Sequence, residues 1–212
     1  MGTDYNQQFK QTLVNLQKRE SLLLHSCCAV CAGGVLAREF AVVGKCDPVT
    51  AKKRLTDYFD VTLYFYNPNI DSREEYDKRA GELEKLKGVF PLRGIVVEDY
   101  RPKEFLVEIK GHEDGQEGAC GRCTRCVSLR LLKAAQYAKN NGFDRFSTVL
   151  SVSPHKNEWE INGMGLKAQR RHNVPFLPAD FKKEHGFLAA TATAKELGLY
   201  RQSYCGCAYS KK

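Results

Sequence analysis

Long hydrophobic runs are missing from this chain of 212 residues, and no stretch approaches the roughly 20 apolar residues of a membrane-spanning helix. The first residues are polar where a secretory leader would be apolar. Low-complexity runs and internal repeats are also missing. These absences exclude repeat architectures and disordered chains, and we expect an ordered, soluble, cytoplasmic protein with no membrane partner.

The composition is that of an ordinary globular protein, with 42% hydrophobic and 27% charged residues. A chain of this length buries roughly 70% of the surface that its unfolded form exposes, so it needs neither disulfides nor a metal merely to fold. Lys and Arg number 33 against 25 Asp and Glu, which gives a formal charge of +8. That excess favours an anionic partner such as nucleic acid.

Strand-like and helix-like segments alternate along the chain. Strand character is found at 21–26, 61–66, 94–98 and 146–150. Helical periodicity and capping residues predict helices at 72–87, 102–110, 128–139, 157–171 and 188–197, and Gly33-Gly34 predicts a turn before another helix. The alternation predicts an α/β fold with a mostly parallel sheet flanked by helices. We expect an N-terminal helical extension at 1–20 and a single metal-binding α/β catalytic domain at 21–212.

Eight of the nine cysteines fall into three clusters, Cys27-Cys28-x-x-Cys31, Cys120-x-x-Cys123-x-x-Cys126 and Cys205-Gly206-Cys207. In the cytosol such thiols stay reduced unless they are catalytic or bind metal, which argues against a structural disulfide framework. One tetrahedral metal or one cubane cluster takes about four thiolates. The surplus indicates a metal centre and something further, while the isolated Cys46 is expected to be an ordinary loop or core thiol.

The first two clusters can supply the ligands of one centre. Cys27 and Cys28 follow the first strand, and sites in open α/β sheets lie beyond the carboxyl ends of strands. Cys123 and Cys126 open a helix, whose positive N-terminal end favours thiolate. Arg130 stands where a ferredoxin segment would have its fourth cysteine, so the remaining ligands must come from elsewhere in the fold. The spacing leaves a [4Fe–4S] cluster and a zinc site with four cysteines both open.

Cys205 and Cys207 form a different kind of pair. In an extended backbone, residues i and i+2 point to the same side, so both thiols are expected to face one centre. They can bind one metal ion together, or they can form a small, strained disulfide that is easily reduced. Cys31 and Cys120 remain either bystanders or supporting residues, because four ligands are found without them.

Longer motifs surround these cysteines. They are Leu-Leu-Leu-His-Ser-Cys-Cys-Ala-Val-Cys31, Phe65-Tyr-Asn-Pro-Asn-Ile70, Arg122-Cys-Thr-Arg-Cys126, Thr148-Val-Leu-Ser-Val-Ser-Pro-His-Lys-Asn157, Leu177-Pro-Ala-Asp-Phe-Lys-Lys183 and Leu199-Tyr-Arg-Gln-Ser-Tyr-Cys-Gly-Cys207. With these motifs the chain resembles the cobalamin-independent epoxyqueuosine reductases, the QueH family, over roughly residues 21 to 210. It departs from that family in residues 38–60, which form a longer link than usual to the second strand.

This resemblance implies an adenine-nucleotide-alpha-hydrolase-like fold of the HUP or Rossmann-like kind. It implies reduction of the epoxide of epoxyqueuosine in tRNA to the cyclopentene of queuosine, the last step of that modification. It also implies a [4Fe–4S] cluster held by Cys27, Cys28, Cys123 and Cys126. Cys205 and Cys207 would then form a redox-active pair, able to hold a second, mononuclear iron, and an external electron donor is expected.

Candidate proton donors and oxyanion contacts are His25, His155, Tyr204 and Asp180. A lone histidine at a strand end also has a purely structural interpretation, and Asp180 could ligate iron or orient a donor. Basic residues near the motifs are candidates for neutralising tRNA phosphates, namely Arg122, Arg125, Arg130, Arg201, Lys182 and Lys183.

Two alternative functions stay open at this point. One is a zinc-stapled RNA-binding module. The other is a cluster-containing tRNA-thiolation enzyme of the same fold, which should carry a Ser-Gly-Gly-x-Asp-Ser phosphate loop after the first strand. This chain has Ser26-Cys-Cys-Ala-Val-Cys31 at that position, so nothing obvious cradles a pyrophosphate there.

Overall fold

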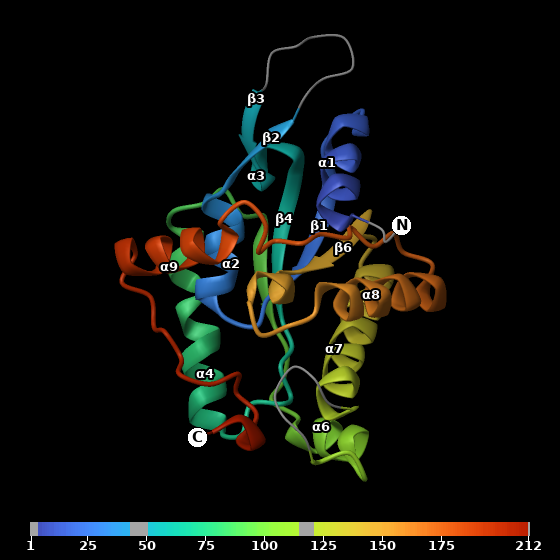
Figure 1. Cartoon of the computed structure of the whole chain (residues 1–212), viewed down its shortest axis with the longest axis vertical. Coiled ribbons are helices and arrows are strands. Elements are labelled where there is room, and N and C mark those ends of the chain that lie inside the picture. Colours follow the sequence, from blue (N-terminus) through green and yellow to red (C-terminus); the bar gives the residue numbers. More distant parts are fainter. Residues whose placement is uncertain (1–3, 43–50, 115–120, 212) are drawn as a thin grey trace.

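A sheet of four parallel strands lies at the centre of the fold (Figure 1). The computed structural model describes residues 4–42, 51–114 and 121–211. The strands lie in the order β5, β4, β1, β6, with the bounds Glu20–His25 for β1, Phe59–Phe65 for β4, Gly94–Val97 for β5 and Arg145–Thr148 for β6. Every pairing in this sheet is parallel, so the predicted α/β fold is confirmed.

The register of the strands brings their carboxyl ends together at one edge of the sheet. His25, the last residue of β1, pairs with Tyr64 of β4 on one side and with Thr148 of β6 on the other. The segments that leave these three strands therefore emerge side by side. Functional sites of open α/β sheets form at such an edge.

Helices cover both faces of the sheet (Figure 1). Alternate residues of β1 point to opposite faces, so Leu22 and Leu24 join one buried core and Leu23 joins the other. The helices that contribute to the first core are α1 (Tyr5–Asn15), α2 (Ala29–Ala37), α4 (Arg73–Glu82) and α9 (Gly186–Glu196). Those that contribute to the second are α7 (Gly121–Asn140) and α8 (Glu158–His172).

Shorter elements connect these layers. They are the strands β2 (Glu39–Val42) and β3 (Ala51–Arg54), the helices α3 (Leu55–Tyr58), α5 (Glu84–Lys87) and α6 (Pro102–Ile109), and the 3₁₀ turns η1 (Val149–Val152) and η2 (Ala208–Ser210). The strands β2 and β3 pair as an antiparallel hairpin that the sequence did not predict. This hairpin lies within residues 38–60, the segment expected from the resemblance to be longer than usual.

The predicted N-terminal helix is present as α1, but it does not stand apart from the core. Asp4 caps it by accepting hydrogen bonds from the amides of Asn6 and Gln7. Phe9 is buried and packs edge-to-face on Phe40 and on Phe181, with ring centroids 4.8 and 5.4 Å away. The division of the chain into an extension and a catalytic domain stays a prediction.

The structure corrects the predicted start of α7. The helix begins at Gly121 rather than at residue 128, and Cys126, Val127, Arg130 and Leu131 form its buried face. These residues are spaced as on one face of a helix. Two of the buried positions hold a cysteine and an arginine, however, where a helical pattern normally has apolar residues. The pattern therefore underestimated the helix by its first two turns.

The structure also corrects the expected turn at Gly33-Gly34. Both glycines lie inside α2, which begins at Ala29. A Cβ on Gly34 would lie 2.3 Å from the Cβ of Ala190, so the glycine allows α9 to pack closely on α2.

The strand predicted at 146–150 is shorter than expected. The Thr148 hydroxyl accepts a hydrogen bond from the Leu150 amide, and this contact starts the turn η1. Among the described helices, none is both long and apolar enough to cross a membrane.

Candidate metal and redox site

A cavity of about 1090 Å³ opens at the carboxyl edge of the sheet. Leu150 and Val152, which follow β6, and Asn69, which follows β4, lie in its wall. Cysteines from all three sequence clusters also line it, namely Cys27, Cys31, Cys123, Cys126, Cys205 and Cys207. The fold thus brings three distant segments to one space, as the sequence requires. Cys46 and Cys120 lie outside the described residues.

The first cysteine group is compact. The sulfurs of Cys27, Cys28 and Cys31 all lie within 4.8 Å of one another, so they could share one metal ion. Cys28 is buried at the N-cap of α2, where its sulfur accepts a hydrogen bond from the Cys31 amide at 3.5 Å. The Cys31 side chain, whose role the sequence left open, therefore belongs to this group.

Hydrogen bonds between these thiols distribute their protons unevenly. The Cys27 thiol donates to the Cys28 sulfur at 3.9 Å, and this bond, together with that from Cys31, holds the pKa of Cys28 well below its usual value. The same bond raises the pKa of Cys27 to about 12, and the pKa of Cys31 is also raised. Cys28 is therefore the most acidic of the three thiols, and thiolate is the form of cysteine that binds metal.

The second cysteine cluster lies on the first turns of α7. Cys126 is buried in a small apolar cluster with Cys207, and with Phe105 and Ile109 of α6. Burial raises the pKa of the Cys126 thiol, and the neighbouring Cys205 raises it further. The structure thus places Cys126 beside the third cysteine cluster. The assignment of Cys27, Cys28, Cys123 and Cys126 as one ligand set stays a prediction.

The third cluster does not have the extended backbone that the sequence analysis assumed. Gly206 has a φ of +105°, in the region that favours glycine, and the chain turns between the two cysteines. The two side chains still interact, because the Cys207 thiol donates a hydrogen bond to Cys205. This bond, with a contact between the Cys205 sulfur and the Ser210 hydroxyl at 3.0 Å, lowers the pKa of Cys205 to about 5, while that of Cys207 is raised. Cys205 is thus the more acidic of the two cysteines, and such a difference suits a redox-active pair.

His25 is a structural residue of the β1 end. It is fully buried, its Nδ1 lies 2.9 Å from the Thr148 hydroxyl, and its Nε2 lies 3.3 Å from the carbonyl oxygen of Tyr66. Burial and the nearby Arg130 lower its pKa to about 3, so the ring is neutral. The structural interpretation of this histidine is favoured over a role as proton donor.

The other candidate proton donors and oxyanion contacts are split between the cavity and its surroundings. His155 and Tyr204 line the cavity, and the Tyr204 hydroxyl donates to the Asp71 carboxylate at 2.7 Å. Asp180 is buried outside the lining and pairs with Lys182 at 3.3 Å. A direct role for Asp180 in the chemistry stays a prediction that its position does not favour.

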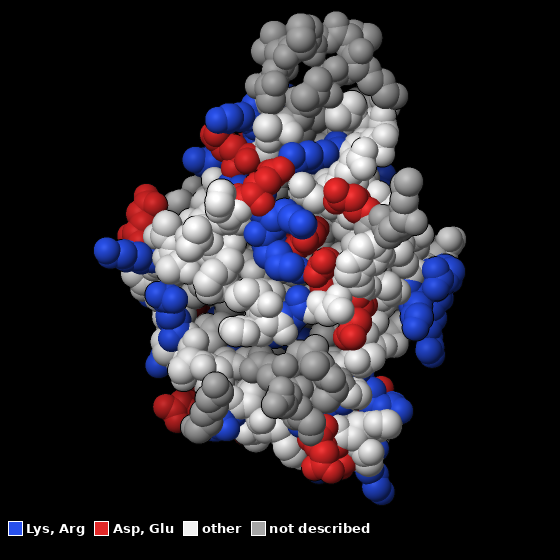
Figure 2. Space-filling model, in the orientation of Figure 1, with Lys and Arg blue, Asp and Glu red and all other residues white. Residues whose placement is uncertain are grey.

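The basic residues predicted to bind phosphates differ in what they can reach. Arg201 is exposed at the cavity, whereas Arg122 and Arg130 are buried in its wall. Arg125 pairs with Glu108 at 3.5 Å. Lys182 pairs with Glu158 at 2.5 Å, and Figure 2 shows positive and negative side chains interleaved across the middle of the face drawn there. A continuous basic surface is therefore not seen in the described part of this face.

Some cavity residues were not singled out from the sequence. The side-chain oxygens of Asn69 and Gln202 are buried without a hydrogen-bond partner among the described residues, and both residues line the cavity. A buried acceptor without a donor is costly, so such atoms are suited to accept from a bound ligand. Lys156 also lines the cavity. Asn69 and Gln202 lie in two of the motifs that carry the family resemblance, and this was the sequence signal that could have found them.

A protein-family model described as epoxyqueuosine reductase QueH matches residues 22–212. The chain belongs to the epoxyqueuosine reductase QueH family. The QueH of Streptococcus pyogenes serotype M1 is 36% identical over 92% of this chain and 71% of its own length. The QueH of Staphylococcus epidermidis is 36% identical over 91% of this chain and 77% of its own length, and that of Thermotoga maritima is 36% identical over 71% and 79%.

Membership of the QueH family confirms the resemblance that the cysteine motifs carried. The two alternatives, a zinc-stapled RNA-binding module and a tRNA-thiolation enzyme, gain no support from these matches. The family match covers all the described cysteines, because it begins before Cys27 and ends after Cys207.

Proposed function

We propose that this chain reduces the epoxide of epoxyqueuosine in tRNA to the cyclopentene of queuosine. One observation carries the proposal beyond family membership: thiols from three distant segments line one cavity at the carboxyl edge of the sheet. Such a concentration of thiols suits electron transfer or metal binding. The cavity is also large enough for a nucleoside, since ligand pockets commonly measure about 300–1,000 Å³.

The reaction has a simple balance. Both C–O bonds of the epoxide break, a C=C bond forms between the two carbons, and the oxygen leaves as water. This consumes two electrons and two protons. Oxidation of the Cys205 and Cys207 sulfurs to a disulfide releases the same two electrons, together with the protons that the two sulfurs carry. Water supplies any proton that Cys205 has already lost, and an external electron donor must then reduce the pair again.

The donor set fits an iron–sulfur cluster. Thiolates are soft ligands that suit such clusters, and hydrogen bonds from Cys27 and Cys31 lower the pKa of Cys28. By the family resemblance, Cys27, Cys28, Cys123 and Cys126 would hold a [4Fe–4S] cluster, with Cys31 close enough to support it. The cluster would supply electrons one at a time from the external donor. The family resemblance also allows a second use of the pair, in which Cys205 and Cys207 hold a mononuclear iron in place of forming the disulfide.

Substrate binding is assigned to the polar and aromatic residues of the cavity. Asn69 and Gln202 offer unpaired acceptor oxygens to hydroxyl or amine donors of the modified base. Phe187 and Tyr209 line the cavity and remain exposed, so either ring can stack on an unpaired base. Arg201 can neutralise a phosphate at the rim.

The test is anaerobic incubation of the reconstituted protein and a strong reductant with tRNA that carries epoxyqueuosine, followed by nucleoside mass spectrometry. We expect the modified base to lose one oxygen. A double variant, Cys205→Ser with Cys207→Ser, should lose turnover under the same conditions. An unchanged base with the wild-type protein would refute the proposed reaction, and full activity of the double variant would refute the role of the pair.

A further inference from the structure

The segment that carries Cys205 and Cys207 is held in place by α4 and by the turn before it. In Figure 1 this last part of the chain runs beside α4, although the two are far apart in sequence. At its start, the Tyr200 amide donates to Glu82 at 2.8 Å, and the Tyr200 hydroxyl donates to Glu75 at 3.2 Å. Nothing in the described segment from Tyr200 to Cys207 is regular helix or strand, so these contacts fix its path.

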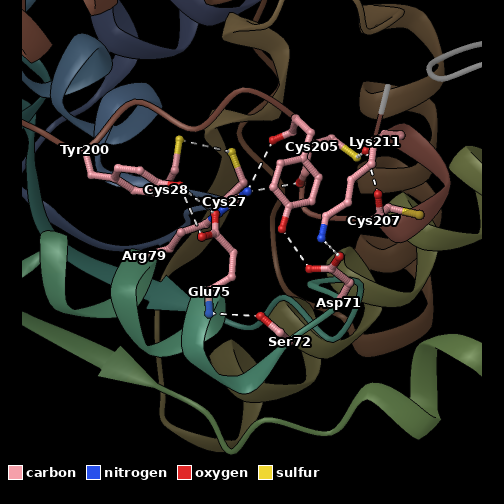
Figure 3. A network of polar contacts seen from close by, with 12 residues as sticks. Cys27, Cys28, Asp71, Ser72, Glu75, Arg79, Tyr200, Cys205, Cys207 and Lys211 are labelled. Atoms are coloured by element: carbon pink, nitrogen blue, oxygen red, sulfur yellow. Dashed lines mark hydrogen bonds and ion pairs between the residues drawn. The ribbon is translucent and has the colours of Figure 1, made fainter.

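Arg79 of α4 makes the most direct of these contacts. Its guanidinium donates to the carbonyl oxygen of Cys205 and to that of Tyr204, each at 3.2 Å. Its Nε donates to Glu75 at 2.6 Å, and the group lies 5.1 Å from the centre of the Tyr204 ring. Figure 3 shows Arg79 with its contacts to Glu75 and to the segment that carries Cys205.

The environment of Arg79 is unusual for a charged residue. Its side chain is only 1% exposed, and that of Glu75 is 13% exposed. A buried ion pair is seldom more stabilising than apolar side chains of the same size, because both charges must leave water. A planar fork with fixed donors, however, can hold two successive carbonyl groups in one orientation, which an apolar side chain cannot do.

A second set of contacts holds the other side of the same turn. The Asp71 amide donates to the carbonyl oxygen of Gly206 at 2.9 Å, and the Asp71 carboxylate binds the Tyr204 hydroxyl and Lys211. The carbonyls of three successive residues, from Tyr204 to Gly206, are thus bound by α4 and its leading turn. The side chains of Cys205 and Cys207 remain among the residues that line the cavity.

We propose that Arg79, paired with Glu75, is a positioning residue that sets the placement of Cys205 and Cys207 in the cavity for the reduction. The redox role of the two cysteines rests on the proposed function. The contacts by which Arg79 holds their backbone, called the clamp below, do not. Arg79 lies in the cavity wall, and three of its five N–H groups donate to Glu75 and to the backbone of the cysteine segment. It acts on the reaction through the position of the sulfurs.

The test compares three variants of the full chain, purified anaerobically. Arg79→Gln removes the positive charge and the planar set of guanidinium N–H donors. Arg79→Lys keeps a positive charge beside Glu75 but cannot donate to two carbonyl groups in the same plane. Arg73→Gln is the matched control, because Arg73 also forms an ion pair four residues away on α4, with Asp77 at 2.7 Å, but is exposed to solvent. Each variant is measured by turnover on tRNA that carries epoxyqueuosine and by hydrogen–deuterium exchange.

We expect kcat of Arg79→Gln to fall about 100-fold, as small displacements of reacting groups commonly cost, with KM for the tRNA nearly unchanged. Exchange should quicken in peptides covering residues 200–208 and stay as in the wild type in peptides from β1. Arg79→Lys should lie between the wild type and Arg79→Gln in both measurements. Arg73→Gln should match the wild type.

If residues 200–208 of Arg79→Gln exchange at the wild-type rate, Arg79 does not hold this segment and the clamp is refuted. An exchange rate that rises equally over the whole chain would refute it as well. Wild-type kcat combined with faster local exchange would overturn the positioning role. If Arg79→Gln does not fold, Arg79→Lys decides by the same two measurements. A wild-type protein that leaves the base unchanged refutes the proposed reaction instead, whereas the exchange comparison still tests the clamp.

Discussion

The two ends of the cavity differ in how their cysteines are held. Cys27, Cys28 and Cys31 come from a strand-to-helix junction, so the buried β1 and the first turn of α2 fix them through local backbone structure. Cys205 and Cys207 lie on an irregular segment, and contacts to residues more than 120 positions away fix them. One part of the site therefore depends on the core for its position, and the other depends on a few buried polar contacts.

The largest effect is expected at the end built from the core. Cys28→Ser removes the most acidic thiol of the three, which also caps α2. We expect iron content and activity to fall to the background of the metal-free protein, measured by metal analysis and nucleoside mass spectrometry. Cys46→Ser, at the one cysteine outside the three clusters, should keep both. Iron retained at the wild-type level in Cys28→Ser would show that this residue is not a ligand.

A smaller effect that is confined to the other end is expected for Gly206→Ala. The new Cβ would meet Ile70 at 2.9 Å in a backbone conformation that other residues rarely adopt. We expect the free energy of unfolding to fall by about 1–3 kcal/mol and turnover to fall about tenfold, with iron content retained.

Gly198→Ala is the matched control for this change. Gly198 also has a positive φ, +57°, but a Cβ there would meet nothing within 4 Å. It should lose stability from backbone strain alone and keep its turnover. Equal turnover in the two variants, measured beside chemical denaturation, would mean that the turn at Gly206 does not place the cysteines.

A third change tests the space between the two ends. Asn69→Leu removes the unpaired acceptor oxygen, whereas Asn69→Asp retains an acceptor. We expect Asn69→Leu to raise KM for the modified tRNA about tenfold, the worth of one hydrogen bond of about 1–1.5 kcal/mol, with a small change in kcat. Asn69→Asp should lie closer to the wild type. Steady-state kinetics that show no change in KM for Asn69→Leu would remove Asn69 from the substrate contacts.

The smallest effect is expected at the opposite, amino edge of the sheet. Hydrogen bonds from the Ser21 amide and hydroxyl, at 2.8 and 2.7 Å, hold the pKa of Asp144 below its usual value. A lowered folded-state pKa means that the carboxylate stabilises the fold above the unfolded-state pKa of about 4, and that this stability is lost as pH falls through the folded-state value.

Asp144→Asn should therefore lower stability at pH 7 by less than about 1 kcal/mol, since the group is largely exposed, and the difference from the wild type should vanish at strongly acidic pH. Activity should not change. Denaturation at several pH values measures the first effect. A loss of turnover in this variant would show that the site is not confined to the carboxyl edge.

Much of the fold followed from local patterns. The apolar runs at β1 and β4 predicted buried parallel strands, and alternation with helices predicted covered faces. The start of α7 was harder to place, because Cys126 and Arg130 occupy buried positions where a helical pattern normally has apolar residues. The hairpin of β2 and β3 gave no clear signal, since short two-stranded pairs depend on their surroundings more than on their own sequence.

The sequence by itself determined the chemistry of the site: three groups of thiols, the first of them placed after a buried strand, and the family motifs around them. Only the tertiary structure decided which groups meet, because contacts between residues far apart in the sequence depend on the path of the whole chain. It placed Cys31 with Cys27 and Cys28, and Cys126 beside Cys205 and Cys207. It also placed the guanidinium of Arg79 at the backbone of the last cysteine cluster, since a buried charge must find its partners wherever the fold brings them.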